Sequence, residues 1–176
     1  MREPRDAKLA PDGRILVWDA AVRLMHLLLA GLVVSDLVRD DGDRLHRALG
    51  YAAAAVVLAR LAWALLSRRG PVAPSVSATL AYLRARTPRR LDHDPLGLWM
   101  VWLLWLLVLL LALTGWMSRL DAFWGDERIQ QLHAWLADAM LVAVALHLMG
   151  VGVMSWRWRE NLAASMIHGR KRAEKR

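Results

Sequence analysis

Four histidines of this chain lie in or beside apolar stretches, where an imidazole is costly unless it serves a function. His133 and His147 share one such stretch and are fourteen residues apart. In a helix this spacing is about four turns and about 21 Å of rise. Both imidazoles would then project from one face of a membrane-crossing helix, one near each side of the bilayer. This pattern predicts a functional site at two depths.

His26, in an earlier apolar stretch, and His46, at the start of another, complete a set of four candidate ligands. Four imidazoles at two depths can hold two haems, each by a pair of axial ligands. Depth along the predicted spans pairs His26 with His147 toward the inner side of the membrane. It pairs His46 with His133 toward the outer side. We therefore expect two haems with these axial pairs.

Three charged residues lie inside the same apolar stretches. Arg60 is fourteen residues after His46, so it shares that face and reaches the depth of the inner pair. It either neutralises a haem propionate or extends to the inner headgroups. Arg23, one turn before His26, is a second propionate candidate. Asp138 either relays protons or makes a polar contact between helices, and we prefer the contact.

Long runs without charge, in a chain that is 57% hydrophobic, indicate a membrane protein. We predict an all-α fold, a transmembrane four-helix bundle forming one domain over residues 1–176. The spans are expected at residues 15–37, 45–66, 96–118 and 129–156. Residues 76–86 and 160–168 are expected to be short interfacial helices. His93 and His168 fall in connections without a partner at matching depth, so we interpret them as surface residues.

The distribution of charge predicts the orientation. The two tails and the connection between the second and third spans hold 17 of the 24 Lys and Arg residues, so both termini are expected to be cytoplasmic. The net charge of +8 is therefore interpreted as topology and contact with anionic lipid, not as nucleic-acid binding. The absence of cysteine excludes disulfides, thiolate ligation and covalently attached c-type haem.

Several segments resemble the prokaryotic cytochrome b561 family, and most closely its nickel–iron hydrogenase-type cytochrome b branch. They are Trp-Asp-Ala-Ala-Val-Arg-Leu-Met-His at residues 18–26, Leu-His-Arg-Ala-Leu-Gly-Tyr at 45–51, His-Asp-Pro-Leu-Gly at 93–97, and the stretches 132–147 and 159–172. The chain departs from the family pattern at Ala21, Leu27, residues 92–95 and Asp138. None of these positions is a candidate ligand.

The resemblance implies a bacterial inner-membrane, multi-pass protein that binds two haem b through His26, His46, His133 and His147. It also implies electron transfer between the quinone pool and a periplasmic redox partner, such as a cytochrome c or a hydrogenase-like subunit. Some relatives instead oxidise superoxide and reduce quinone. Two alternatives from other classes remain, a bundle whose histidines bind a divalent ion and a non-haem membrane anchor subunit. We expect the electron-transfer function.

Overall fold

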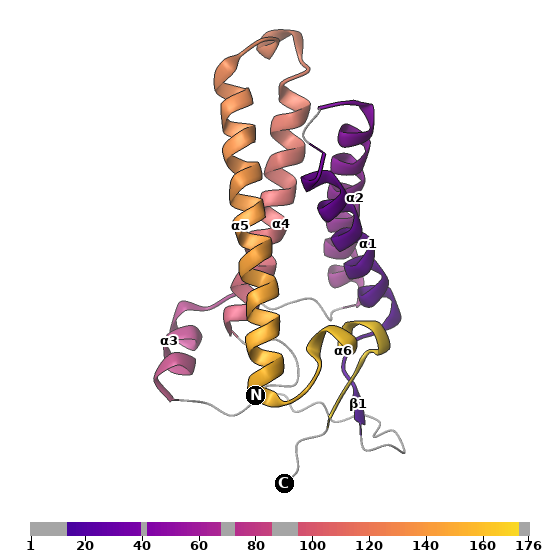
Figure 1. The fold of residues 1–176 in the computed structure, drawn as a ribbon, viewed down its shortest axis with the longest axis vertical. Helices are drawn as coiled ribbons and strands as arrows, with labels where there is room; N and C mark the ends of the chain where they lie inside the picture. The colour runs from indigo at the N-terminus through magenta and orange to yellow at the C-terminus, as the bar shows by residue number, and fades with distance from the viewer. Residues whose placement is uncertain (1–13, 40–41, 68–72, 86–94, 173–176) are drawn as a thin grey trace.

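The computed structural model describes residues 14–39, 42–67, 73–85 and 95–172. Four long helices run alongside one another (Figure 1): α1 (Ala20–Leu37), α2 (Arg44–Ser67), α4 (Pro95–Met117) and α5 (Glu127–Trp158). Each is long and apolar enough to cross a membrane. The predicted all-α membrane bundle of four spans is therefore confirmed.

Shorter elements gather at the two ends of the bundle. They are α3 (Val76–Ala85), the 3-10 helix η1 (Asp121–Phe123), α6 (Leu162–His168), and the strands β1 (Arg14–Leu16) and β2 (Arg170–Arg172). In Figure 1, α3, α6 and β1 lie at one end, and η1, which joins α4 to α5, lies at the other. The two segments predicted as interfacial helices are α3 and α6. His93 lies outside the described residues.

The first span begins later than predicted. Asp19 caps α1 by accepting a hydrogen bond of 2.8 Å from the backbone N–H of Val22. Residues 15 and 16, expected in this helix, instead form β1, which pairs antiparallel with β2. The physical reason is that residues before a helix cap are extended and their N–H groups need partners, which the C-terminal segment supplies.

The buried core lies among three of the four long helices. Its members are Ala53 and Val57 of α2, Trp105, Leu107 and Val108 of α4, and Met140 and Ala143 of α5. Helix α2 packs on α1 and α4, and α4 packs on α5. Within the described residues, α5 does not pack closely on either α1 or α2. The side chains that α5 directs toward α1 and α2 therefore face these helices across a wider gap than the one between α5 and α4.

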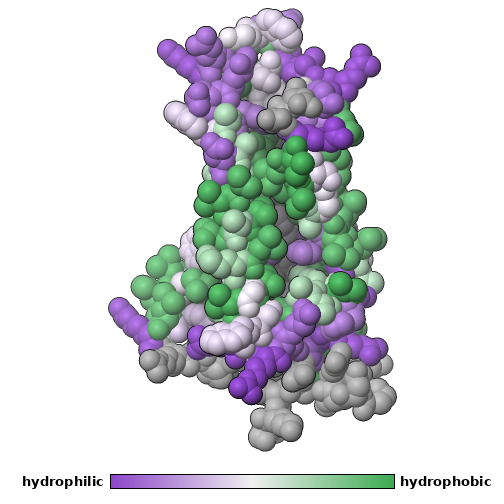
Figure 2. Space-filling view, viewed as in Figure 1, coloured by the Kyte–Doolittle hydropathy of each residue, from purple (hydrophilic) through white to green (hydrophobic). Residues whose placement is uncertain are grey.

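The surface has the polarity expected for a lipid environment. Figure 2 shows a band of hydrophobic side chains around the middle of the molecule, with hydrophilic side chains at both ends. The longest helix, α5, has 32 residues and is about 48 Å long, which exceeds the hydrocarbon thickness of about 30 Å. An upright α5 therefore extends beyond the hydrocarbon layer.

Candidate functional site

The structure brings the four histidines of the spans together as two pairs. The ring centroids of His26 in α1 and His147 in α5 are 6.4 Å apart, with the rings inclined at 53°. Those of His46 in α2 and His133 in α5 are 6.2 Å apart, with the rings inclined at 78°. These are the partners expected from depth. Both pairs bridge α5 and the α1–α2 half of the bundle, where the helices do not pack closely.

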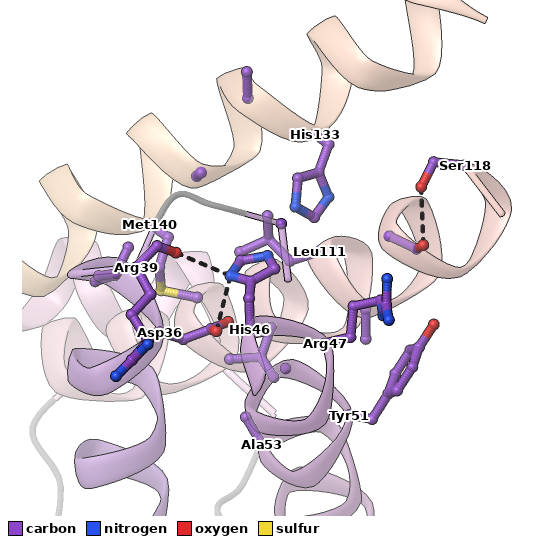
Figure 3. Close-up of a pocket in the computed structure, with 18 of the residues that line it drawn as sticks. Asp36, Arg39, His46, Arg47, Tyr51, Ala53, Leu111, Ser118, His133 and Met140 are labelled. Carbon is purple, nitrogen blue, oxygen red and sulfur yellow. Dashed lines mark hydrogen bonds and ion pairs between the residues drawn. The ribbon is translucent and has the colours of Figure 1, made fainter. Parts of the chain in front are cut away.

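A cavity of about 590 Å³ lies at the outer pair, defined as His46 and His133. Figure 3 shows the two imidazoles pointing toward one another from α2 and α5. Small residues form much of the remaining wall: Gly50, Ala53, Ala112, Gly115, Ala134 and Ala137. Sites for small molecules have volumes of about 300–1,000 Å³. The outer pair therefore has room beside it for a ligand of cofactor size.

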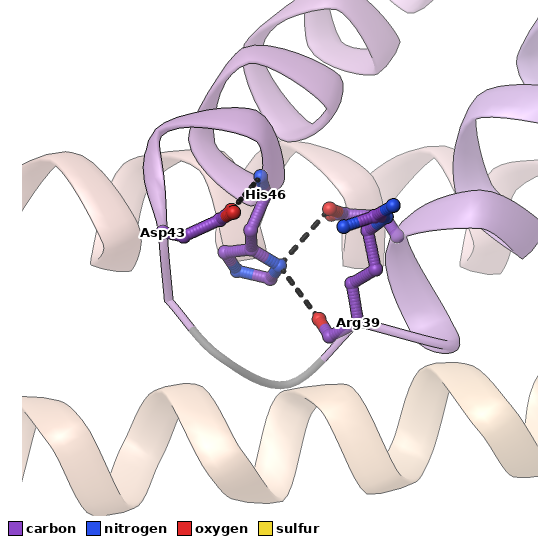
Figure 4. A network of polar contacts seen from close by, with 4 residues as sticks. Arg39, Asp43 and His46 are labelled. Atoms are coloured by element: carbon purple, nitrogen blue, oxygen red, sulfur yellow. Dashed lines mark hydrogen bonds and ion pairs between the residues drawn. The ribbon is translucent and has the colours of Figure 1, made fainter.

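The ring of His46 is oriented by contacts at its Nδ1 atom. Its Nδ1 lies 3.0 Å from the backbone carbonyl oxygen of Arg39 and 3.0 Å from Oδ1 of Asp36 (Figure 4). The backbone N–H of His46 also donates a 2.7 Å hydrogen bond to Oδ1 of Asp43. An Nδ1–H that donates to the carbonyl leaves Nε2 with its lone pair.

The ring of His133 is held in the same way by Thr114 of α4. Oγ1 of Thr114 lies 2.9 Å from the carbonyl oxygen of Leu110, to which its hydroxyl donates. It also lies 2.8 Å from Nδ1 of His133, so it is placed to accept a hydrogen bond from the Nδ1–H tautomer of this ring. A Cβ atom at the neighbouring Gly115 would lie 3.4 Å from Cε1 of His133. The ring is thus oriented from one side and bounded on another, with Nε2 left as the acceptor.

The inner pair, His26 and His147, has a different environment. Nδ1 of His26 is buried and has no hydrogen-bond partner among the described residues. Arg60 of α2 is only 9% exposed, and its guanidinium carbon lies 5.8 Å from the ring centroid of Trp105. Nη1 of Arg60 is likewise buried, with no partner in the described part of the chain. A buried guanidinium with a free donor suits an anionic group.

Arg23, the second propionate candidate, is directed toward α6. Its Nη1 donates to the carbonyl oxygen of Ile167. A cation at the C-terminus of a helix is favoured by the helix dipole. Nε of Arg23 is buried and lacks a partner among the residues that the structure describes. Arg23 therefore connects α1 to α6 and retains one donor for another group.

Two other predicted residues have separate positions. Nδ1 of His168, at the end of α6, accepts a 3.1 Å hydrogen bond from the backbone N–H of Arg170. Asp138 lines the outer cavity. Among the described residues, no group of three or more His, Asp or Glu side chains is arranged to hold a metal ion. The structure therefore gives no support in these regions to the divalent-ion alternative.

Sequence reasoning missed the residues that hold the outer imidazoles. Asp36 was not singled out, although it belongs to the last turn of α1 and faces His46. Thr114 was not singled out. Apart from Ser118 it carries the only hydroxyl in residues 96–118, and an isolated hydroxyl in an apolar span was the available signal.

Comparison with known proteins identifies the family. A family model described as prokaryotic cytochrome b561 matches residues 17–169, a range that contains all four paired histidines. No curated protein and no solved structure matches the chain. The family consists of membrane proteins that bind haem b and transfer electrons. This chain belongs to the prokaryotic cytochrome b561 family.

Proposed function

We propose that this chain is a dihaem b-type cytochrome of the bacterial inner membrane. In this proposal it passes electrons between the quinone pool and a periplasmic redox partner. The axial ligands are His26 with His147 for the inner haem and His46 with His133 for the outer haem. The observation that carries the proposal is the presence of two imidazole pairs with nearly equal ring separations, 6.4 and 6.2 Å.

These separations suit two imidazoles on opposite sides of one metal ion. A metal–imidazole bond is about 2 Å long, and adding the ring radius on each side gives about 6 Å between centroids. Packed side chains without such a function have no reason to reproduce this distance twice at two depths. The orientation of the outer rings also supports coordination, because hydrogen bonds at Nδ1 leave Nε2 of each imidazole available as a ligand.

The two proposed haem sites lie one after the other along the path of the electron across the membrane. Fourteen residues of α5 separate His133 from His147, which is about 21 Å along the helix. A haem held by two imidazoles supplies one-electron transfer and has no open position at which oxygen would bind. The chain's own contribution is to hold each ring plane between α5 and its opposite helix and to exclude water from the apolar interior.

Arginines are proposed to compensate the negative charge of the haem propionates. Arg60 offers a buried Nη1 without a partner among the described residues, at the depth of the inner pair. Arg23 offers its buried Nε, although its Nη1 already donates to Ile167. A charge-assisted hydrogen bond to a carboxylate would satisfy either group.

Haem content tests this function directly. A pyridine haemochrome assay of purified protein should give two haem b per chain. His133→Ala and His147→Ala should each lose one haem, because each removes a ligand of a different pair. His168→Ala is the matched control and should retain both haems, since this histidine at the end of α6 accepts from the backbone N–H of Arg170 in β2. Unchanged haem content in the His133 and His147 variants would reject the ligand assignment. Reduction of the haems by an added quinol would then test the quinone partner.

A further inference from the structure

The two histidine pairs differ in what touches Nδ1. At the outer pair, a carboxylate oxygen of Asp36 lies 3.0 Å from Nδ1 of His46. At the inner pair, Nδ1 of His26 has no hydrogen-bond partner among the described residues, and the charge of the buried Arg60 on α2 is opposed by that of Asp19. We propose that Asp36 is a positioning residue that acts through His46 to lower the reduction potential of the outer haem relative to the inner one. This inference rests on the proposed function.

Asp36 is placed so that its charge reaches the imidazole with little solvent between them. Its side chain is 21% exposed, and Oδ1 is buried. Nδ1–H of His46 is directed at the carbonyl of Arg39, so Oδ1 of Asp36 has no hydrogen bond to disperse its charge. A carboxylate in this position acts on the ring through the electrostatic field, which is stronger away from bulk water.

The helix packing accommodates this carboxylate. Oδ2 of Asp36 lies 3.5 Å from the position that a Cβ atom would take at Gly50 of α2. A Cβ atom at position 50 would be in ordinary van der Waals contact with the carboxylate, so the carboxylate lies directly against the α2 surface beside His46. The contact thus depends on the tertiary packing of α1 against α2 and not on one side chain alone.

A negative charge beside a metal-bound imidazole raises the basicity of the ligand and favours the more positively charged, oxidised metal. Three arginines also line the outer cavity: Arg39, Arg47 and Arg119. Arg39 and Arg119 are exposed, so solvent and salt screen their charges more than that of the buried carboxylate oxygen. Arg47 is half-buried, but Figure 3 shows its guanidinium directed away from the ring of His46. The contact of Asp36 with His46, which has no counterpart at Nδ1 of His26 among the described residues, therefore favours electron transfer from the outer to the inner site.

An optical redox titration of the purified protein tests the proposal. Asp36→Asn keeps the shape of the side chain and removes its charge. It should raise the midpoint potential of the outer haem by about 59 mV, equivalent to about a tenfold change in the ratio of oxidised to reduced haem. The inner haem should not shift. The His133→Ala variant, which retains only the inner haem, assigns the two steps.

The matched control is Asp43→Asn. Asp43 carries the same charge, but it is exposed to solvent and its carboxylate accepts from the backbone N–H of His46, so its charge acts more weakly on the ring. Its substitution should leave both potentials near the wild-type values. Equal shifts in Asp36→Asn and Asp43→Asn, equal shifts of both haems, or no shift in Asp36→Asn would overturn the proposal.

The haem content of the Asp36 variants distinguishes a changed potential of the outer haem from loss of that haem. Asp36→Asn should retain both haems, and Asp36→Glu, which keeps the charge, should retain both haems and a potential of the outer haem near the wild-type value. Loss of the outer haem in either variant would overturn the proposal, because Asp36 would then be needed to hold the haem and not to set its potential. Wild-type protein without two haems would reject the proposed function itself, whatever the Asp36 variants do.

Discussion

The hydroxyl of Thr114 in α4 lies 2.8 Å from Nδ1 of His133 in α5. When the same hydroxyl donates to the carbonyl oxygen of Leu110, it accepts a hydrogen bond from the Nδ1–H tautomer of the imidazole. This contact sets the tautomer of His133 and directs Nε2 toward His46. Helix α4, which carries none of the paired histidines, thereby takes part in the site.

Thr114→Val should weaken haem binding at the outer pair. Valine keeps the shape of threonine but leaves the Nδ1–H of His133 without an acceptor, at a cost of about 1–3 kcal/mol. We expect about a tenfold or greater loss of affinity for the outer haem, measured by titrating haem into protein depleted of it. Ser118→Ala is the control, because Ser118 lines the same cavity but donates to the carbonyl of Gly115. Equal affinity in both variants would contradict the role of Thr114.

Arg60→Gln should lower the potential of the inner haem. The substitution removes a cation that is only 9% exposed and lies at the depth of His26 and His147. With less positive charge nearby, the oxidised form of the haem becomes more stable relative to the reduced form. A redox titration should show one step shifted downward and the other unchanged. Arg60→Lys, which keeps the charge, should stay near wild type. A downward shift as large in Arg60→Lys would indicate that packing on Trp105, and not charge, is responsible.

Gly169→Ala should destabilise the connection between the two ends of the chain. Gly169 has φ of 76°, and its carbonyl oxygen accepts from the N–H groups of Val17 and Trp18. An added Cβ would lie 2.8 Å from the carbonyl oxygen of Trp18. We expect a loss of about 1–2 kcal/mol for the left-handed conformation and about 1–3 kcal/mol more for the overlap.

The control for this substitution is Gly125→Ala. Gly125 also has φ of 76°, but a Cβ there would meet nothing within 4 Å. It should show only the conformational cost. Thermal unfolding followed by tryptophan fluorescence compares the two variants, and equal melting temperatures would argue against a tight contact at Gly169.

Single cysteines can test the orientation, because the chain contains none of its own. Positive charge on the side of α3 and α6 predicts that this end is cytoplasmic. In spheroplasts, an impermeant maleimide should label Asp121→Cys in η1. It should label Ser77→Cys in α3 only after the membrane is permeabilised. Both positions are exposed, so the reverse pattern would show an inverted topology.

The predicted spans agree with the helices because local apolar composition decides both. The run at residues 96–118, for example, corresponds to α4 at Pro95–Met117. The start of α1 was placed too early for a reason that local sequence does not contain. Ile15 is apolar enough to continue a span, but it pairs with Lys171, more than 150 residues away along the chain.

The histidine partners were predictable from sequence, whereas their surroundings were not. Depth follows from counting residues, since each residue of a helix adds a fixed rise, and this is enough to match His26 with His147 and His46 with His133. The rotation of each helix and its lateral neighbours are set by packing between distant segments. Contacts such as Thr114 with His133 and Asp36 with His46 depend on that packing.

Sequence by itself thus determined that four apolar helices span a membrane and that imidazoles lie at two heights, because hydrophobicity and helical rise are local properties. Only the tertiary structure decided which nitrogen of His46 and His133 is held, which carboxylate lies beside His46, and how the C-terminal strand joins the N-terminal one. These features arise from side chains that meet across helices, where distances of a few ångströms are fixed by packing and not by order along the chain.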